Sequence, residues 1–263
     1  MGTRISSFAY ASLRTSVASA MQYRTDFVLD ALVEVLWMSS AIVPLWVVFS
    51  IRTSLAGFTA AEALMVTAFF TTLQGIMEGL ISPSMLQVVD QVRKGTFDFV
   101  LLKPVDSQIS VTLGKLQFWK CVNIVTGIVL GGIALAKVGH APSFGNCMHA
   151  LCMLVIATLI LYAIWLLGVS LSFKFGRVDN LTYLFVSVFD AARWPGTVFR
   201  GVMRIVFTYV IPLSIMTTFP AKALLGTLSG TETGVGLVVA MAFVVASRLA
   251  WTRALGGYTS ASS

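Results

Sequence analysis

The stretch QVRKGTFDFVLLKP, residues 91–104, decides how the rest of the sequence is interpreted. It is the one well-charged, turn-bearing segment between long apolar blocks, in a chain of which only 11% is charged. Before it, residues 85–94 have apolar positions at helical spacing, and Gly95 is well placed to end that helix. Four large apolar side chains continue through the segment: Phe97, Phe99, Leu101 and Leu102. The pattern predicts a docking element for a soluble partner, and the alternative is an amphipathic hairpin resting on lipid.

The composition is that of a membrane protein. Hydrophobic residues make up 57% of the 263 residues and the mean hydropathy is +0.88, whereas soluble domains have about 45–50% apolar and about 25% charged residues. This length predicts a single transmembrane domain over residues 1–263. The net charge of +7 is expected to mark cytoplasmic loops and anionic lipid headgroups, and no nucleic-acid partner is expected.

An all-α integral membrane fold with six transmembrane helices is predicted, because the apolar blocks suit ~30 Å of hydrocarbon. The predicted spans cover residues 27–51, 61–81, 111–136, 147–173, 178–195 and 234–251, and residues 83–110 form the loop between the second and third. In residues 3–24, arginines interrupt an amphipathic pattern, which is typical of a helix lying in the membrane interface. No cleaved signal peptide is expected.

The segment before the last span has two interpretations. In the favoured one, residues 178–195 are the fifth span and residues 196–228 form short re-entrant helices in the outer leaflet. In the other, residues 205–219 are the centre of the fifth span and residues 181–200 lie on the cytoplasmic side. Three prolines punctuate this segment: Pro195, Pro212 and Pro220.

The distribution of Lys and Arg predicts the orientation. With the N-terminus inside, twelve of the 18 basic residues fall on the cytoplasmic side. Positive charge is enriched in cytoplasmic loops, so both termini and the charged segment are predicted to be cytoplasmic.

The sequence lacks the motifs of the common enzyme classes. It contains no His-Glu-x-x-His, no Gly-x-Ser-x-Gly and no glycine-rich phosphate loop. The two histidines, His140 and His149, make a poor metal site, and the three cysteines are expected to act as small hydrophobic residues. We therefore expect neither an enzymatic site nor a bound metal or cofactor in this chain.

Charged residues within the predicted spans carry more information. Glu34, Glu78 and Lys120 all fall in the inner leaflet when residues are counted from the cytoplasmic ends at ~1.5 Å each. An unpaired charge there costs several kcal/mol, so Lys120 is predicted to pair with one of the two glutamates. Asp190 and Arg193 form a similar predicted pair at the outer end of the fifth span. A purely stabilising pair, with no role in transport, is an equally open interpretation.

The segment VRKGTFDFVLLKPVD, residues 92–106, resembles the signature loop of permease subunits of ABC-2-type ATP-binding-cassette exporters, in the subgroup of six-span permeases encoded apart from their ATPase. Four further matches extend the resemblance over nearly the whole chain: YRTDF at 23–27, the Gly114-Lys115 pair, WPGTVFRGVMR at 194–204 and IPLSIMTTFPAKALLG at 211–226.

The resemblance implies that ATP and Mg bind to separate ATPase subunits, which receive the loop after the second span as a coupling helix. The residues implied in this contact are Asp90, Arg93, Lys94, Phe97, Asp98 and Lys103. It further implies a second permease, identical or a sister chain, with an outer gate at Pro195, Pro212 and Pro220, in the bacterial cytoplasmic membrane. The apolar spans favour a small amphipathic or lipophilic substrate.

Two other functions remain open on the sequence. One is a membrane scaffold that docks a cytoplasmic protein without moving solute. The other is a proton-coupled secondary transporter that uses Glu34, Glu78 and Asp190 as a proton relay.

Overall fold

The computed structural model describes residues 33, 36, 39, 42–55, 57–112, 114–117, 120, 122–139, 141–175 and 185–258. This part of the chain is built from helices and has no strand beyond an isolated bridge between Leu55 and Phe58, so the predicted all-helical class is confirmed. The predicted interface helix over residues 3–24 and the side chain of Glu34 lie outside the described residues. Of the first predicted span, the structure describes the helix Ile42–Ile51.

One unusually long helix runs through the molecule. It consists of α3 (Ala60–Ile76), a π-helical turn (Met77–Ile81) and α4 (Ser82–Arg93). Its 34 residues measure about 51 Å at ~1.5 Å per residue, whereas the hydrocarbon of a bilayer is ~30 Å thick. The second predicted span and the predicted coupling helix are therefore one continuous element, which is longer than an apolar layer of that thickness.

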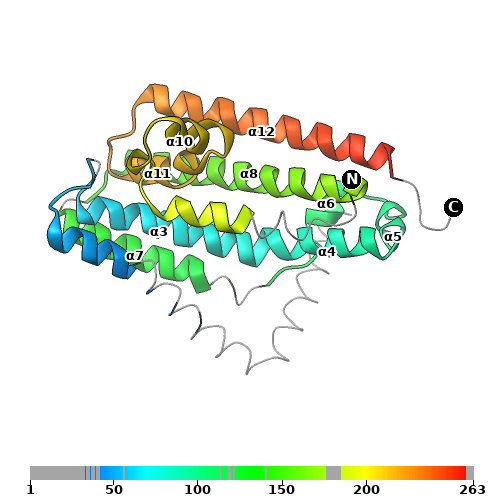
Figure 1. Cartoon of the computed structure of the whole chain (residues 1–263), viewed down its shortest axis with the longest axis horizontal. Coiled ribbons are helices and arrows are strands. Elements are labelled where there is room, and N and C mark those ends of the chain that lie inside the picture. Colours follow the sequence, from blue (N-terminus) through cyan, green and yellow to red (C-terminus); the bar gives the residue numbers. More distant parts are fainter. Residues whose placement is uncertain are drawn as a thin grey trace.

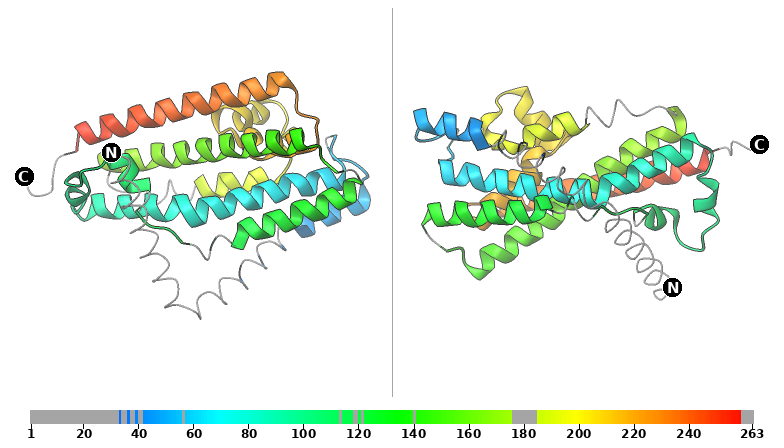
Figure 2. Two further views of the ribbon diagram at one scale, coloured as in Figure 1. Left: turned by 180° about the vertical axis from the view of Figure 1, so that it is seen from behind. Right: turned by 90° about the horizontal axis from the view of Figure 1, so that it is seen from below.

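The other long helices pack along this one, as Figures 1 and 2 show. α7 (Val122–Val138) lies against α3, α8 (Phe144–Phe175) contacts both α4 and α3, and α12 (Gly230–Gly256) covers α8 on the far side. Two short helices, α5 (Asp98–Leu101) and α6 (Ser107–Thr112), lie near the C-terminal ends of α4 and α12. We call this end of the bundle the loop end.

Three of the described helices are long and apolar enough to cross a membrane, and a bent pair would make a fourth. The chain is thus a multi-pass membrane protein by this criterion, while the predicted count of six spans stays a prediction. The third predicted span differs, because its helix begins at Val122 rather than at residue 111. The backbone before it bonds to the long helix instead: the Gln117 N–H donates to the Gly79 carbonyl, and the Ser84 hydroxyl bonds to Lys115.

The bent pair lies opposite the loop end. α10 (Val202–Ile205) continues into a π-helical turn (Val206–Val210) and is followed by α11 (Leu213–Leu224). The pieces Val202–Val210 and Leu213–Leu224 meet at 81°, and Pro212 stands at the break. Residues 205–219 therefore do not form one straight helix, and the pair is either a broken span or a re-entrant loop, so both interpretations of this segment stay open. α11 packs between α8 and α3.

Small residues allow α3 and α7 to approach closely. A Cβ atom added to Gly127 would lie 2.2 Å from the Thr72 hydroxyl and 2.7 Å from the Ala68 carbonyl oxygen. An added Cβ on Gly75 would lie 2.7 Å from the backbone nitrogen of Ile124. No side chain fits at such distances, so these glycines determine how near the two helices lie.

Replacing Gly127 with alanine should therefore destabilise the bundle by about 1–3 kcal/mol, because the new methyl group overpacks the contact. Thermal unfolding of the purified protein in detergent would show this as a lower Tm. Gly132→Ala is the matched control on the same helix, since a Cβ there meets nothing within 4 Å. Equal Tm values for the two variants would contradict the close contact of α3 and α7 at Gly127.

Candidate functional site

The C-terminus of the long helix is closed by a glycine cap. Gly95 has φ = 69°, the left-handed region that glycine adopts without strain. Its N–H donates to the Val92 carbonyl at 3.2 Å, and the Thr96 N–H donates to the Gln91 carbonyl at 2.9 Å. These are the two hydrogen bonds of a Schellman motif, so the predicted stop at Gly95 is confirmed.

Charged side chains surround this cap. Asp90 accepts from Arg93 Nη2 at 2.9 Å and from Lys94 Nζ at 2.6 Å, and both basic side chains are exposed. Lys103 is exposed further along the loop, while Asp98 is half-buried. The charges thus lie on the surface of the loop end, available to a partner of complementary charge.

The apolar residues of the loop divide into two sets. Phe97 is fully buried, with ring centroids 5.1 Å from Phe173, 6.2 Å from Trp251 and 5.7 Å from Tyr258. The Phe97 ring therefore binds the loop to α8 and to the end of α12, and its role in coupling stays a prediction. Three other side chains point outward, with exposed fractions of 70% for Phe99, 44% for Leu101 and 79% for Leu102. We call these three the apolar tip.

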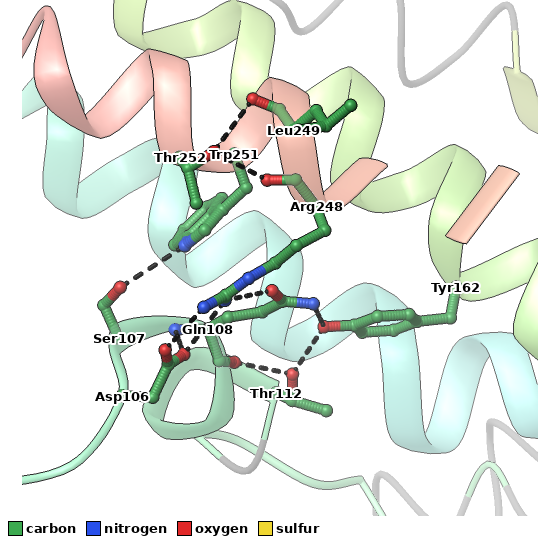
Figure 3. Close-up of polar contacts among 9 residues, drawn as sticks. All are labelled: Asp106, Ser107, Gln108, Thr112, Tyr162, Arg248, Leu249, Trp251 and Thr252. Atoms are coloured by element: carbon green, nitrogen blue, oxygen red, sulfur yellow. Dashed lines mark hydrogen bonds and ion pairs between the residues drawn. The ribbon is translucent and has the colours of Figure 1, made fainter. Parts of the chain in front are cut away.

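A second set of contacts holds the loop from the other side (Figure 3). Arg248 on α12 binds Asp106 through both guanidinium Nη atoms, at 2.8 and 3.2 Å, and Arg248 Nη1 donates to the Gln108 side-chain oxygen. The Gln108 amide in turn donates to the Tyr162 hydroxyl on α8 at 3.1 Å. We call Asp106, Gln108 and Arg248 the latch, because bidentate pairing fixes orientation as well as distance.

The latch changes the titration of its carboxylate. Hydrogen bonds and charge from Arg248 lower the pKa of Asp106 below its ordinary value. Burial of the Tyr258 hydroxyl, with the Asp98 carboxylate nearby, raises the pKa of that tyrosine. Both groups therefore keep their usual charge at neutral pH.

A polar cavity of about 390 Å³ opens beside the π-helical turn. Its walls carry both predicted ion pairs: Lys120 Nζ lies 3.9 Å from Glu78, and Arg193 Nη2 lies 3.3 Å from Asp190. Glu78 also accepts from the Gln74 amide at 3.0 Å, and the Arg193 guanidinium lies over the Phe70 ring. Of the two partners predicted for Lys120, Glu78 is thus one that the structure places beside it.

A family model described as "ABC-2 family transporter protein" matches residues 35–262. The chain belongs to the ABC-2 transporter family. Searches among curated proteins and among solved structures found no match. This ABC-2 protein is accordingly a membrane transport component, of a family whose members typically pair with ABC ATPase subunits.

The three prolines predicted to form the outer gate of this ABC-2 protein all lie around α11. Pro212 stands at the bend, Pro220 is inside α11, and Pro195 precedes a 3-10 turn (Gly196–Val198). Gly196 packs directly on α11, since its N–H donates to the Thr218 hydroxyl at 3.0 Å and an added Cβ would meet Ser214. The prolines therefore shape one packed unit, and their role as a gate stays a prediction.

Two sets of functional candidates in the ABC-2 protein were missed by sequence reasoning. The first is the latch, whose partners Asp106 and Arg248 are separated by 142 residues, so no local pattern could pair them. The second is the ion pair between Lys222 on α11 and Glu232 on α12, beside a cavity of about 440 Å³. Here a signal exists: Ser229 and Glu232 form the S-x-x-E pattern of a capping box, which marks the start of α12.

The latch of the ABC-2 protein predicts a pH-dependent stability. Asp106→Asn should lower the free energy of unfolding by about 1 kcal/mol at neutral pH, as expected for a half-exposed bidentate pair. Because the folded-state pKa of Asp106 is depressed, this contribution is present above the unfolded pKa and is lost as pH falls through the folded pKa.

The Tm values of wild type and of Asp106→Asn should therefore differ at pH 7, approach each other as pH falls below about 3.9, and converge once the pH is below the depressed folded-state pKa. Arg253→Gln, at an exposed position near the end of α12, is the control and should leave the Tm unchanged. A difference between wild type and Asp106→Asn that persists unchanged at low pH would contradict the latch.

Proposed function

We propose that this chain is the permease subunit of an ABC exporter and that it couples to separate ATPase subunits through residues 86–106. The observation that supports this proposal is the exposed apolar tip. Exposed apolar patches commonly mark surfaces that bind a partner, and Phe99 and Leu102 form such a patch at the loop end. The charges of Arg93 and Lys94 border this tip and would orient a partner.

The connections of the loop support a role in transmitting force. A contact surface on a flexible loop would move without moving the bundle. Here the loop is the continuation of a long helix, its Phe97 ring is buried against α8 and α12, and its Asp106 is bound to Arg248. A displacement of the tip therefore displaces three long helices together, which suits rigid-body switching between inward and outward access.

The proposed assembly contains two permeases, identical or sister chains, above two ATPase subunits that bind ATP and Mg. It lies in the bacterial cytoplasmic membrane with both termini and the loop end in the cytoplasm. The loop end collects basic side chains such as Arg93, Lys94 and Arg253, in agreement with the enrichment of positive charge on that side. The bent pair then lies in the outer leaflet, and the substrate is a small amphipathic or lipophilic molecule.

The decisive experiment combines the purified full chain in nanodiscs with a separately encoded ABC ATPase of the same organism. Phe99→Ala with Leu102→Ala is expected to reduce ATPase binding and stimulation at least about tenfold, because a large apolar anchor at a contact contributes ≥ ~1.4 kcal/mol. Both residues are exposed, so the Tm should stay the same.

Phe144→Ala is the matched control, since Phe144 is 82% exposed at the start of α8, on the opposite end of the bundle. Undiminished ATPase stimulation in the double variant would overturn the proposed contact. Transport that needs a proton gradient and no nucleotide would favour a secondary transporter, and docking of a protein without solute movement would favour a scaffold.

A further inference from the structure

The π-helical turn in the long helix shapes the cavity beside it. A π-helical turn interrupts the regular hydrogen-bond ladder of a helix and is found frequently at functional sites. The interruption covers Met77–Ile81, and the Gly79 carbonyl accepts from the Gln117 backbone N–H at 2.8 Å. Glu78 and Gln117 both line the cavity, so this contact joins two of its walls.

The charges on the cavity walls are balanced. The described lining residues include two acids, Glu78 and Asp190, and two bases, Lys120 and Arg193, joined as two ion pairs. A ligand with a net charge would leave one charge uncompensated in this partly buried place, which is costly. A ligand that carries one positive and one negative group can contact both kinds of wall group and leave the summed charge of the described lining at zero.

Polar and apolar residues share the rest of the described lining. Phe70, Pro83, Leu86 and Val186 contribute apolar walls next to the ion pairs. A cavity of about 390 Å³ is within the range of ~300–1,000 Å³ that holds small molecules.

We propose that the cavity binds a zwitterionic amphiphile, with its two charged groups between the ion pairs and its apolar part against the Phe70 side of the cavity. The proposal rests on the proposed function in one respect, because it takes this molecule to be the transported cargo. The same chemistry is offered by a lipid with a zwitterionic headgroup and by a small zwitterionic solute, and the experiment separates these two sources.

The test measures binding to the purified full chain in a nonionic detergent, without any ATPase. Three fluorescent single-chain probes of equal chain length are compared below their micellar concentrations: an alkylphosphocholine, an alkyltrimethylammonium and an alkyl sulfate. The wild type is expected to bind the alkylphosphocholine about tenfold more tightly than either charged probe, a difference of ~1.4 kcal/mol. Competition by glycerophosphocholine, which has no alkyl chain, indicates a small solute, and its failure to compete indicates a lipid.

Variants that remove a single charge should change which of the three probes binds most tightly. Glu78→Gln removes one negative charge from the cavity lining and should favour the alkyl sulfate, whereas Lys120→Gln removes one positive charge and should favour the alkyltrimethylammonium. Asp190→Asn, on the other pair, should act like Glu78→Gln and provides a second test if that variant does not fold. Lys137→Gln, at an exposed position near the end of α7, is the matched control and should bind as wild type does.

The proposal is overturned if the wild type prefers a charged probe, if no probe binds saturably, or if the order of the probes is the same in every folded variant. Because no ATPase is present, a failure here is distinct from a failure of the proposed contact at the apolar tip. The two results together tell whether the site, the coupling or both are assigned correctly.

Discussion

The mismatch between helix length and membrane thickness is the constraint on which the structure depends. A helix of 34 residues is longer than ~30 Å of hydrocarbon, so part of it extends beyond an apolar layer of that thickness. Because the helix is continuous through the π-helical turn, the same element lines the polar cavity at Glu78 and ends at the cap on Gly95. The cavity beside Glu78 and the proposed docking surface at the loop end are thereby connected by one hydrogen-bonded helix, and no flexible linker separates them.

The features that depend on local chemistry were predictable from the sequence. The stop at Gly95 follows from glycine's freedom to adopt positive φ, and the bend at Pro212 follows from proline's missing N–H. The pairing of Lys120 with Glu78 was predictable as one of two options, because a charge in an apolar environment must find a partner. In each case a few neighbouring residues, or a strong energetic penalty, settle the outcome.

Features that depend on tertiary packing were not predictable in the same way. The sequence pattern grouped Phe97 with Phe99 among the apolar side chains of the docking segment. In the structure, α8 and α12 bury Phe97, while Phe99 stays exposed. The late start of α7 at Val122 has a similar origin, because Gln117 and Lys115 bond to the long helix across space and leave their own helical ladder. The latch joins residues from opposite halves of the chain, which hydrophobic periodicity does not encode.

The two attachments of α12 have a mechanical consequence. Near its first turn, Glu232 is bound to Lys222 of the bent pair, and near its last turns Arg248 is bound to Asp106 of the loop. Between these two residues α12 is a continuous helix about 24 Å long at ~1.5 Å per residue, and most of its outer face is exposed. A force applied at one end of α12 is therefore transmitted to the other end along this helix, which lies at the edge of the bundle.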